Sequence, residues 1–204
     1  MPDARTSVSG VSGPIARVRA ALGTRRATLA ERDEPFHEAA VALILRPTAQ
    51  HDDLDLLMIR RATREGDPWS GQIGLPGGRF DRADLSLEHT ALRETMEEVG
   101  LDLRAHGEVL GALDELRPRT PVLPPIIVRP FVCVVGAVPA LVHSDEVAEH
   151  RWVRVSELFA PGRRVRTTVR VRNFTLDVEA YQVGDFTVWG MTERILTTFE
   201  GVWR

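Results

Sequence analysis

The sequence predicts an α/β fold in which helices flank a mixed β-sheet. Apolar runs typical of strands lie on both sides of a strongly predicted helix at residues 87–99, so the two kinds of element alternate in mixed order. The 204 residues with 43% hydrophobic content suffice for one compact domain with a sizeable core. We therefore expect a single domain at 15–204, preceded by a disordered tail at 1–14 that is rich in Ser, Gly and Thr.

The first part of the chain predicts one helix and two strands. Apolar side chains at helical spacing indicate a short amphipathic helix over residues 15–22. Two apolar runs, 39–45 and 54–60, are separated by a polar segment, which predicts a pair of strands. Residues 60–74 then form a long polar connection. Loops of this length inside a compact domain are usually functional.

The helix at 87–99 is bounded by Ser86, a good N-cap, and by Gly100 just past its end. At 100° per residue, the apolar and acidic side chains separate onto opposite faces. The apolar face is expected to consist of Leu92, Met96 and Val99. The acidic face is expected to consist of Glu94, Glu97 and Glu98.

The rest of the chain predicts strands, a hairpin and a closing helix. The predicted strand segments are 107–113, 126–138, 142–153, 164–172 and 174–181. The last two form a hairpin around Asn173, and residues 192–199 form the closing helix. Trp152 is expected to point inward and Ser156 to cap a short turn. The Pro-rich loop at 117–125 should lie near the ligand.

The acidic face of the central helix is poorly suited to stability. Glu94 and Glu98 are like charges four residues apart, and they lie near the helix end where the dipole disfavours negative charge. One interpretation is a solvated face on which Arg93 pairs with Glu97. The other is a cation site, and oxygen-only ligands without His or Cys suit Mg²⁺ or Mn²⁺.

Residues 75–101, LPGGRFDRADLSLEHTALRETMEEVGL, resemble the Nudix box, the signature G-x5-E-x7-R-E-U-x-E-E-x-G-U in which U is a bulky aliphatic residue. The matching positions are Gly78, Arg93, Glu94, Glu97, Glu98, Gly100 and Leu101. Asp84 stands in place of the loop Glu, with one extra residue before Arg93, and Thr95 replaces the first aliphatic residue. A strand, loop and helix signature with this many matches is far more specific than a lone Gly-rich loop.

This resemblance implies an α/β/α sandwich and metal-dependent hydrolysis of a nucleoside diphosphate linked to another moiety. The implied metal ligands are the carboxylates of Glu94, Glu97 and Glu98 and the backbone carbonyl of Gly78. Arg93 is expected to orient the acids through an ion pair. The general base is left open between Glu98 and Glu146, and Glu146 is equally well explained as a solvated turn residue.

The flanks of the box are similar to the coenzyme A diphosphatase branch of this family. Arg61-Ala62 followed by Gly71-x-x-x-Leu75-Pro-Gly-Gly is similar to the motif before the box there, and 189–196 is similar to that branch's final helix. Asp67 departs from the pattern because the branch has an Arg at that point. The candidate substrate-binding residues are Arg60, Arg61, Arg64, Arg117 and Arg119. Nucleotide sugars, ADP-ribose and dinucleoside polyphosphates are the alternative substrates, and a nucleotide sensor without activity is the alternative of another class.

Alternation in the strand at 164–172 places four arginines on one face. They are Arg164, Arg166, Arg170 and Arg172. Such a face could grip phosphates or RNA. We favour a solvated sheet face paired with Asp177 and Glu179 on the returning strand.

Composition narrows the function classes further. The chain contains no Lys, which excludes Schiff-base chemistry and a P-loop lysine, and its net charge of −3 gives no general attraction to nucleic acid. Cys133 lies in an apolar run and is expected to be a buried small residue. No segment is typical of a membrane span or a secretion signal, so we expect a cytoplasmic protein without membrane or nucleic-acid partners. A homodimer is left open.

Overall fold

The computed structural model describes residues 13–50, 52–65, 69–118, 125–171 and 174–204. Its helices are α1 (Pro14–Thr24), α2 (Leu87–Val99), α3 (Leu103–His106), α4 (Val155–Leu158) and α5 (Met191–Trp203). Its strands are β1 (His37–Pro47), β2 (Leu54–Arg61), β3 (Ile73–Gly74), β4 (Gly77–Arg79), β5 (Gly107–Ala112), β6 (Ile126–Val135), β7 (Val147–Arg154), β8 (Arg164–Val171), β9 (Phe174–Val183) and β10 (Phe186–Trp189).

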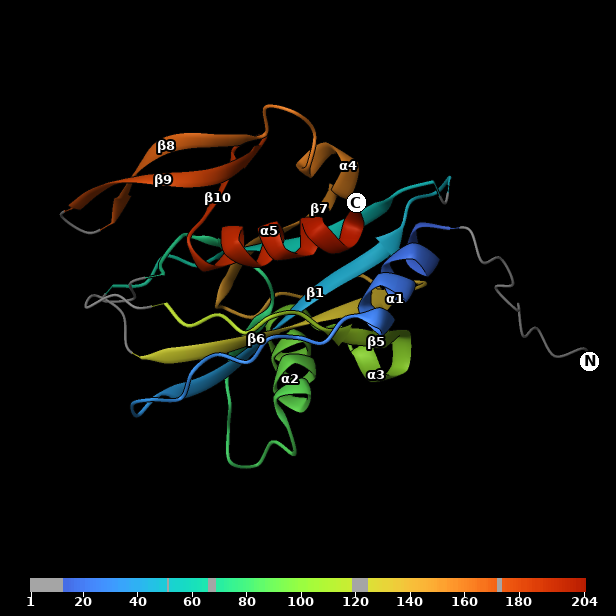
Figure 1. The fold of residues 1–204 in the computed structure, drawn as a ribbon, viewed down its shortest axis with the longest axis horizontal. Helices are drawn as coiled ribbons and strands as arrows, with labels where there is room; N and C mark the ends of the chain where they lie inside the picture. The colour runs from blue at the N-terminus through green and yellow to red at the C-terminus, as the bar shows by residue number, and fades with distance from the viewer. Residues whose placement is uncertain (1–12, 51, 66–68, 119–124, 172–173) are drawn as a thin grey trace, which may run out of the picture.

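These elements form an α/β/α sandwich, as the sequence predicts. The large sheet has the order β3-β2-β1-β6-β5, with β4 also paired to β1 and β7 to β2. It is mixed, because β1 runs parallel to β6 and antiparallel to β2. A second sheet, β10-β9-β8, projects beyond α5 at the upper left of Figure 1.

Alternation along β1 explains the three layers. Leu43 and Leu45 face the core that includes side chains of α1 and α5, whereas Ala42 and Ile44 face the core that includes side chains of α2 and α3. All four side chains are fully buried. A strand that is apolar on both faces must be covered on both faces, and the two pairs of helices provide that cover.

Helix α2 begins and ends where the sequence predicts. The Ser86 hydroxyl accepts a hydrogen bond from the backbone N–H of His89 at 3.1 Å, and Gly100 has a left-handed φ of 69°. The predicted apolar face is wrong at one position, because Met96 is 51% exposed. The buried face of α2 instead consists mainly of small side chains and one acid, because this face packs against β1 and β4. Its members are Thr90, Ala91, Thr95, Glu98 and Val99.

Other predicted elements differ in detail. Helix α1 begins at Pro14, inside the predicted tail, whereas residues 1–12 lie outside the described residues. Ser156 does not cap α4; its hydroxyl donates to the carboxylate of Asp53, and Arg154 is the N-cap residue without a side-chain bond. Trp152 is half-buried, with the Arg46 guanidinium 4.2 Å from its ring centre. The sequence analysis missed the short elements β3, β4, β10 and α3.

The hairpin of β8 and β9 is confirmed, while Asn173 and Arg172 lie outside the described residues. Side chains along β8 alternate between exposed and half-buried, so its arginines share the exposed face. Arg166 is paired in register with Glu179. Cys133 is buried in β6, as expected. Within the described ranges, no helix is long and apolar enough to cross a membrane.

Candidate active site

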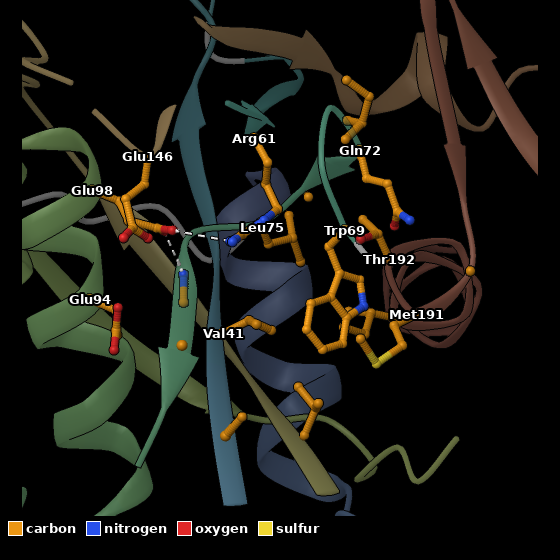
Figure 2. Close-up of a pocket in the computed structure, with 18 of the residues that line it drawn as sticks. Val41, Arg61, Trp69, Gln72, Leu75, Glu94, Glu98, Glu146, Met191 and Thr192 are labelled. Atoms are coloured by element: carbon orange, nitrogen blue, oxygen red, sulfur yellow. Dashed lines mark hydrogen bonds and ion pairs between the residues drawn. The ribbon is translucent and has the colours of Figure 1, made fainter. Parts of the chain in front are cut away.

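A cavity of about 960 Å³ lies where the sheet, α2 and the C-terminal segment meet (Figure 2). One end of it, which we call the acid end, carries Gly78, Glu94, Glu97, Glu98 and Glu146. Figure 2 shows Trp69, Met191 and Thr192 on the opposite side of the cavity from Glu94 and Glu98. The cavity therefore joins residues of the motif with residues far from it in sequence.

The glycine pair of β4 allows α2 to approach the sheet closely. A Cβ atom on Gly77 would lie 2.3 Å from the carbonyl oxygen of Ala40, and Gly77 has a φ of 155°, which side chains rarely adopt. A Cβ atom on Gly78 would lie 2.4 Å from the Glu94 Oε1 atom. A side chain at Gly77 would clash with the backbone, and one at Gly78 would displace the Glu94 carboxylate. The two glycines therefore place backbone groups directly against the carboxylates of α2.

Glu98 is the most buried acid of the site, with 3% exposure. Its Oε2 atom accepts a hydrogen bond from the backbone N–H of Gly77 at 2.9 Å, and the Arg61 Nη1 atom lies 3.8 Å from Oε1. Burial raises the pKa of Glu98 to about 7, and the negative charges of Glu94 and Glu146 act in the same direction. Burial also raises the pKa of Glu94. Burial therefore disfavours the charged form of both carboxylates.

Arg93 ties the loop to the helix. Its Nε and Nη2 atoms donate to the two Asp84 oxygens at 2.9 and 3.0 Å, and its Nη1 atom lies 2.9 Å from both Glu94 and Glu97. Asp84 also accepts from the Thr90 hydroxyl at 2.8 Å. The hydrogen bonds from Arg93 hold the pKa of Asp84 well below its usual range. Asp84, which replaces the Glu of the motif, therefore has a structural role: it holds the Arg93 guanidinium next to the carboxylates of Glu94 and Glu97.

Glu97 and Glu146 are more open to solvent than Glu98. The Glu97 side chain is 57% exposed, lines the cavity and pairs with Arg93 one helical turn earlier on α2. The Glu146 side chain lines the cavity, and its Oε1 atom accepts from the Arg64 Nη1 atom at 3.0 Å. The carbonyl of Glu146 accepts from the backbone N–H of Ala62 at 2.7 Å, which fixes this loop to the end of β2.

Only one of the five arginines predicted to bind substrate lines the cavity among the described residues, and it is Arg61. Arg60 forms ion pairs with Glu149 and Asp185, and Arg64 pairs with Asp145 and Glu146. Arg117 is held by Asp33 and Glu34, with a side chain only 5% exposed. Arg119 lies outside the described residues, as do Asp67 and most of the Pro-rich loop.

Two contributors to the cavity were missed by the sequence analysis. Arg79 lines the cavity with an exposed side chain and forms no ion pair with any other residue the structure describes. The signal in the sequence that could have identified Arg79 is its position directly after Gly78 of the motif. The second is the set of apolar side chains that residues 171–195 contribute to the cavity. One of them, Leu176, is 42% exposed and had no local signal in the sequence.

The acid end fits a hard divalent cation. The two inward carboxylates, Glu94 and Glu98, and the backbone of Gly78 provide oxygen atoms only. Across the described ranges, no group of three or more His, Cys, Asp or Glu side chains forms a ready-made metal site. Mg²⁺ commonly keeps several waters and is held by one or two carboxylates together with substrate phosphates. The arrangement suits a cation that binds with a phosphorylated ligand.

Comparison with known proteins agrees with this fold and motif. The family model described as NUDIX domain matches residues 35–172, about two thirds of the chain. The chain belongs to the Nudix family, whose hydrolases generally require divalent metal ions. It is similar to an uncharacterized Nudix hydrolase, NudL, of Pectobacterium atrosepticum, with 31% identity over 79% of this chain and 82% of that protein. These matches define the class of the protein as a Nudix-domain protein.

Two further similarities extend the comparison. An uncharacterized protein of Schizosaccharomyces pombe is 36% identical over 56% of this chain, which spans only 36% of that longer protein. A MutT/nudix family protein from Enterococcus faecalis has a similar fold, with a TM-score of 0.57 and 23% identity over 85% of this chain and 64% of that chain. The structural match supports the fold alone.

Proposed function

We propose that the chain hydrolyses the diphosphate bond of a nucleoside diphosphate linked to another moiety. The observation that carries the proposal is the acid end itself, where Glu94 and Glu98 are turned inward against the glycine pair of β4. A sensor without activity would have no need of two carboxylates at a buried helix end, where each raises the cost of the other's charge.

Mg²⁺ or Mn²⁺ would be held by Glu94, Glu98 and the carbonyl of Gly78, with Glu97 as a further or bridging ligand. Bound there, the cation would neutralise charge that develops on the diphosphate oxygens and activate a water. Arg93 orients Glu94 and Glu97 while Asp84 holds its guanidinium in place. Glu98 and Glu146 are the candidates for the general base.

Coenzyme A or an acyl derivative is the proposed substrate, on the basis of the flanking motifs. Its 3′-phosphate would need a cationic partner, and Arg61 and Arg79 are the arginines that line the cavity in the described part of the chain. Arg60 and Arg117 already neutralise acids elsewhere, so the proposal does not use them. Nucleotide sugars, ADP-ribose and dinucleoside polyphosphates are the alternatives. A cytoplasmic location and a homodimer stay predictions from the sequence.

The test is a panel of diphosphate compounds assayed with Mg²⁺, with Mn²⁺ and with excess chelator. For coenzyme A, kcat/KM should exceed that for its form without the 3′-phosphate by at least ~10-fold, which is the effect of about 1.4 kcal/mol from one charged contact. Equal cleavage of the two forms would reject the coenzyme A assignment and leave the broader diphosphatase. Full activity in chelator, or no hydrolysis of any compound with either metal, would reject the enzyme proposal.

A further inference from the structure

The end of the cavity opposite the carboxylates has a different composition. We call it the apolar end and define it by the lining that residues 171–195 contribute. These residues are Val171, Leu176, Trp189, Gly190, Met191, Thr192 and Ile195. None of them is charged, and the polar groups of the set are the Thr192 hydroxyl and the Trp189 indole N–H. All charged side chains of the described lining belong to β2, β4, α2 or the loop before β7.

Residues from the large sheet extend the apolar end into a continuous surface. Ile126 and Val128 of β6 form a small core cluster against which Val41 and Met191 pack. All four side chains line the cavity, as does the indole of Trp69. Because both sheets and the start of α5 contribute, this surface exists only in the folded chain.

Leu176 shows that apolar area at this end is left open to solvent. It lies on β9, lines the cavity and is 42% exposed. Exposed apolar area in a cavity favours an apolar ligand group, whereas a phosphate or another charged group would lose its hydration there without gaining a charged partner. The wall from 176 to 195 also lies beyond residues 35–172, the part that the family model matches.

We propose that the apolar end binds an uncharged, apolar group carried by the moiety that the diphosphate links to the nucleoside. The inference rests on the proposed function, because the acid end would hold the diphosphate while the same cavity holds this group. It makes Leu176 a residue that sets specificity and takes no part in the bond cleavage. An alkyl or acyl chain and an unsubstituted aromatic ring share the required chemistry.

The test separates binding from turnover. Alkyl esters of adenosine 5′-(α,β-methylene)diphosphate that carry a methyl, hexyl or decyl group resist hydrolysis, and a phenyl ester distinguishes a ring from a chain. Their Kd values would be measured with Mg²⁺ by calorimetry on the full chain. We expect the hexyl ester to bind at least ~10-fold more tightly than the methyl ester, because burial of several methylene groups is favourable. A tighter phenyl than hexyl ester would assign the site to a ring and would support the same apolar chemistry.

Leu176→Ser should weaken binding of the hexyl ester by about 3-fold or more and leave the methyl ester unchanged, because it removes apolar contact area only at the far end. Leu29→Ser is the matched control, since Leu29 is 58% exposed and does not line the cavity. Equal affinity of wild-type protein for the methyl, hexyl and phenyl esters, including no binding of any, would overturn the inference. So would an equal loss for both alkyl esters in Leu176→Ser.

Hydrolysis of the corresponding ADP esters, assayed in parallel, keeps the two proposals distinguishable. A gain in affinity with chain length but no cleavage of any ester would refute the proposed hydrolysis and support the apolar end. Cleavage of the esters with a Kd that does not depend on the alkyl group would support the proposed hydrolysis and refute the apolar end.

Discussion

The two ends of the cavity are built in different ways. The acid end comes mainly from one continuous stretch, in which the glycines of β4 lie against the carboxylates of α2 at contact distance. The apolar end, with Leu176 and Met191, continues into Trp69 and Ile126, so its surface comes from segments far apart in sequence. A short local motif can therefore position the reacting groups, whereas the shape of the cavity that selects a substrate depends on long-range packing. Changes at the acid end should therefore alter kcat, and changes at the apolar end should alter substrate affinity.

The largest effect is expected from the acids of α2. Glu98→Gln and Glu97→Gln keep the shape of the side chain but remove its charge, so each should lower kcat by ~10² or more. The fold should persist, because a neutral amide avoids the cost of burying the Glu98 carboxylate. Steady-state kinetics with Mg²⁺ and thermal unfolding would measure the two effects. Glu88→Gln on the exposed first turn of α2 is the matched control, and normal turnover in both active-site variants would contradict the assignment.

Substitutions of the two glycines of β4 should have different effects, one on activity and the other on stability. Gly78→Ala would place a Cβ atom 2.4 Å from the Glu94 carboxylate, a flexible group that can move, so we expect kcat to fall by ~10-fold with little loss of stability. Gly77→Ala would meet the backbone of Ala40 and adopt a strained φ, so it should lower the free energy of unfolding by about 2–3 kcal/mol. Kinetics and denaturant unfolding of both variants would show whether the effects separate. Identical behaviour would mean that the glycine positions have no distinct roles.

The link between Asp84 and Arg93 should appear as pH-dependent stability. The Arg93 hydrogen bonds lower the pKa of Asp84 in the folded state, so this contribution is present above the unfolded-state pKa of about 4 and is lost as pH falls through the folded-state value. Asp84→Asn should cost about 2 kcal/mol near pH 7, and its difference from wild type should shrink toward pH 3. Thermal unfolding from pH 7 to pH 3 would measure it, with Asp177→Asn on β9 as the control. A difference that stays constant with pH would argue against the ion pair.

The smallest effect is expected on the exposed face of β8. Arg166 lies opposite Glu179 in the strand register at the surface, and exposed charged side chains contribute little to stability, so Arg166→Ala should change the free energy of unfolding by less than about 0.5 kcal/mol. It should also leave kcat/KM for the diphosphate substrate unchanged. A marked loss of activity would show that this strand contacts the substrate's phosphates. RNA affinity that depends on salt and survives removal of the α2 acids would favour the alternative of an RNA-binding strand.

Local signals in the sequence were sufficient for the helix and its motif. Ser86 and Gly100 determine the ends of α2, because a side-chain cap and a left-handed glycine act over three or four residues. Apolar runs predicted β1 and β2, and two strand-like segments around Asn173 predicted the β8–β9 hairpin. The matches at Arg93 and Glu94 led to the family that the comparisons confirm.

Tertiary structure alone decided which side chains face inward. A helical wheel centred on apolar residues places Met96 inside, but Glu98 is buried instead, because its carboxylate accepts a hydrogen bond from the backbone N–H of Gly77 on the neighbouring strand. The partners of Arg60 and Arg117 come from acids that are far away in sequence, so the positive charge of these residues could not indicate a substrate site. The apolar end was equally hidden, because Trp69, Leu176 and Met191 form one surface only after the two sheets and α5 have packed together. Sequence spacing reports neighbours along one element, whereas a cavity depends on distances between elements.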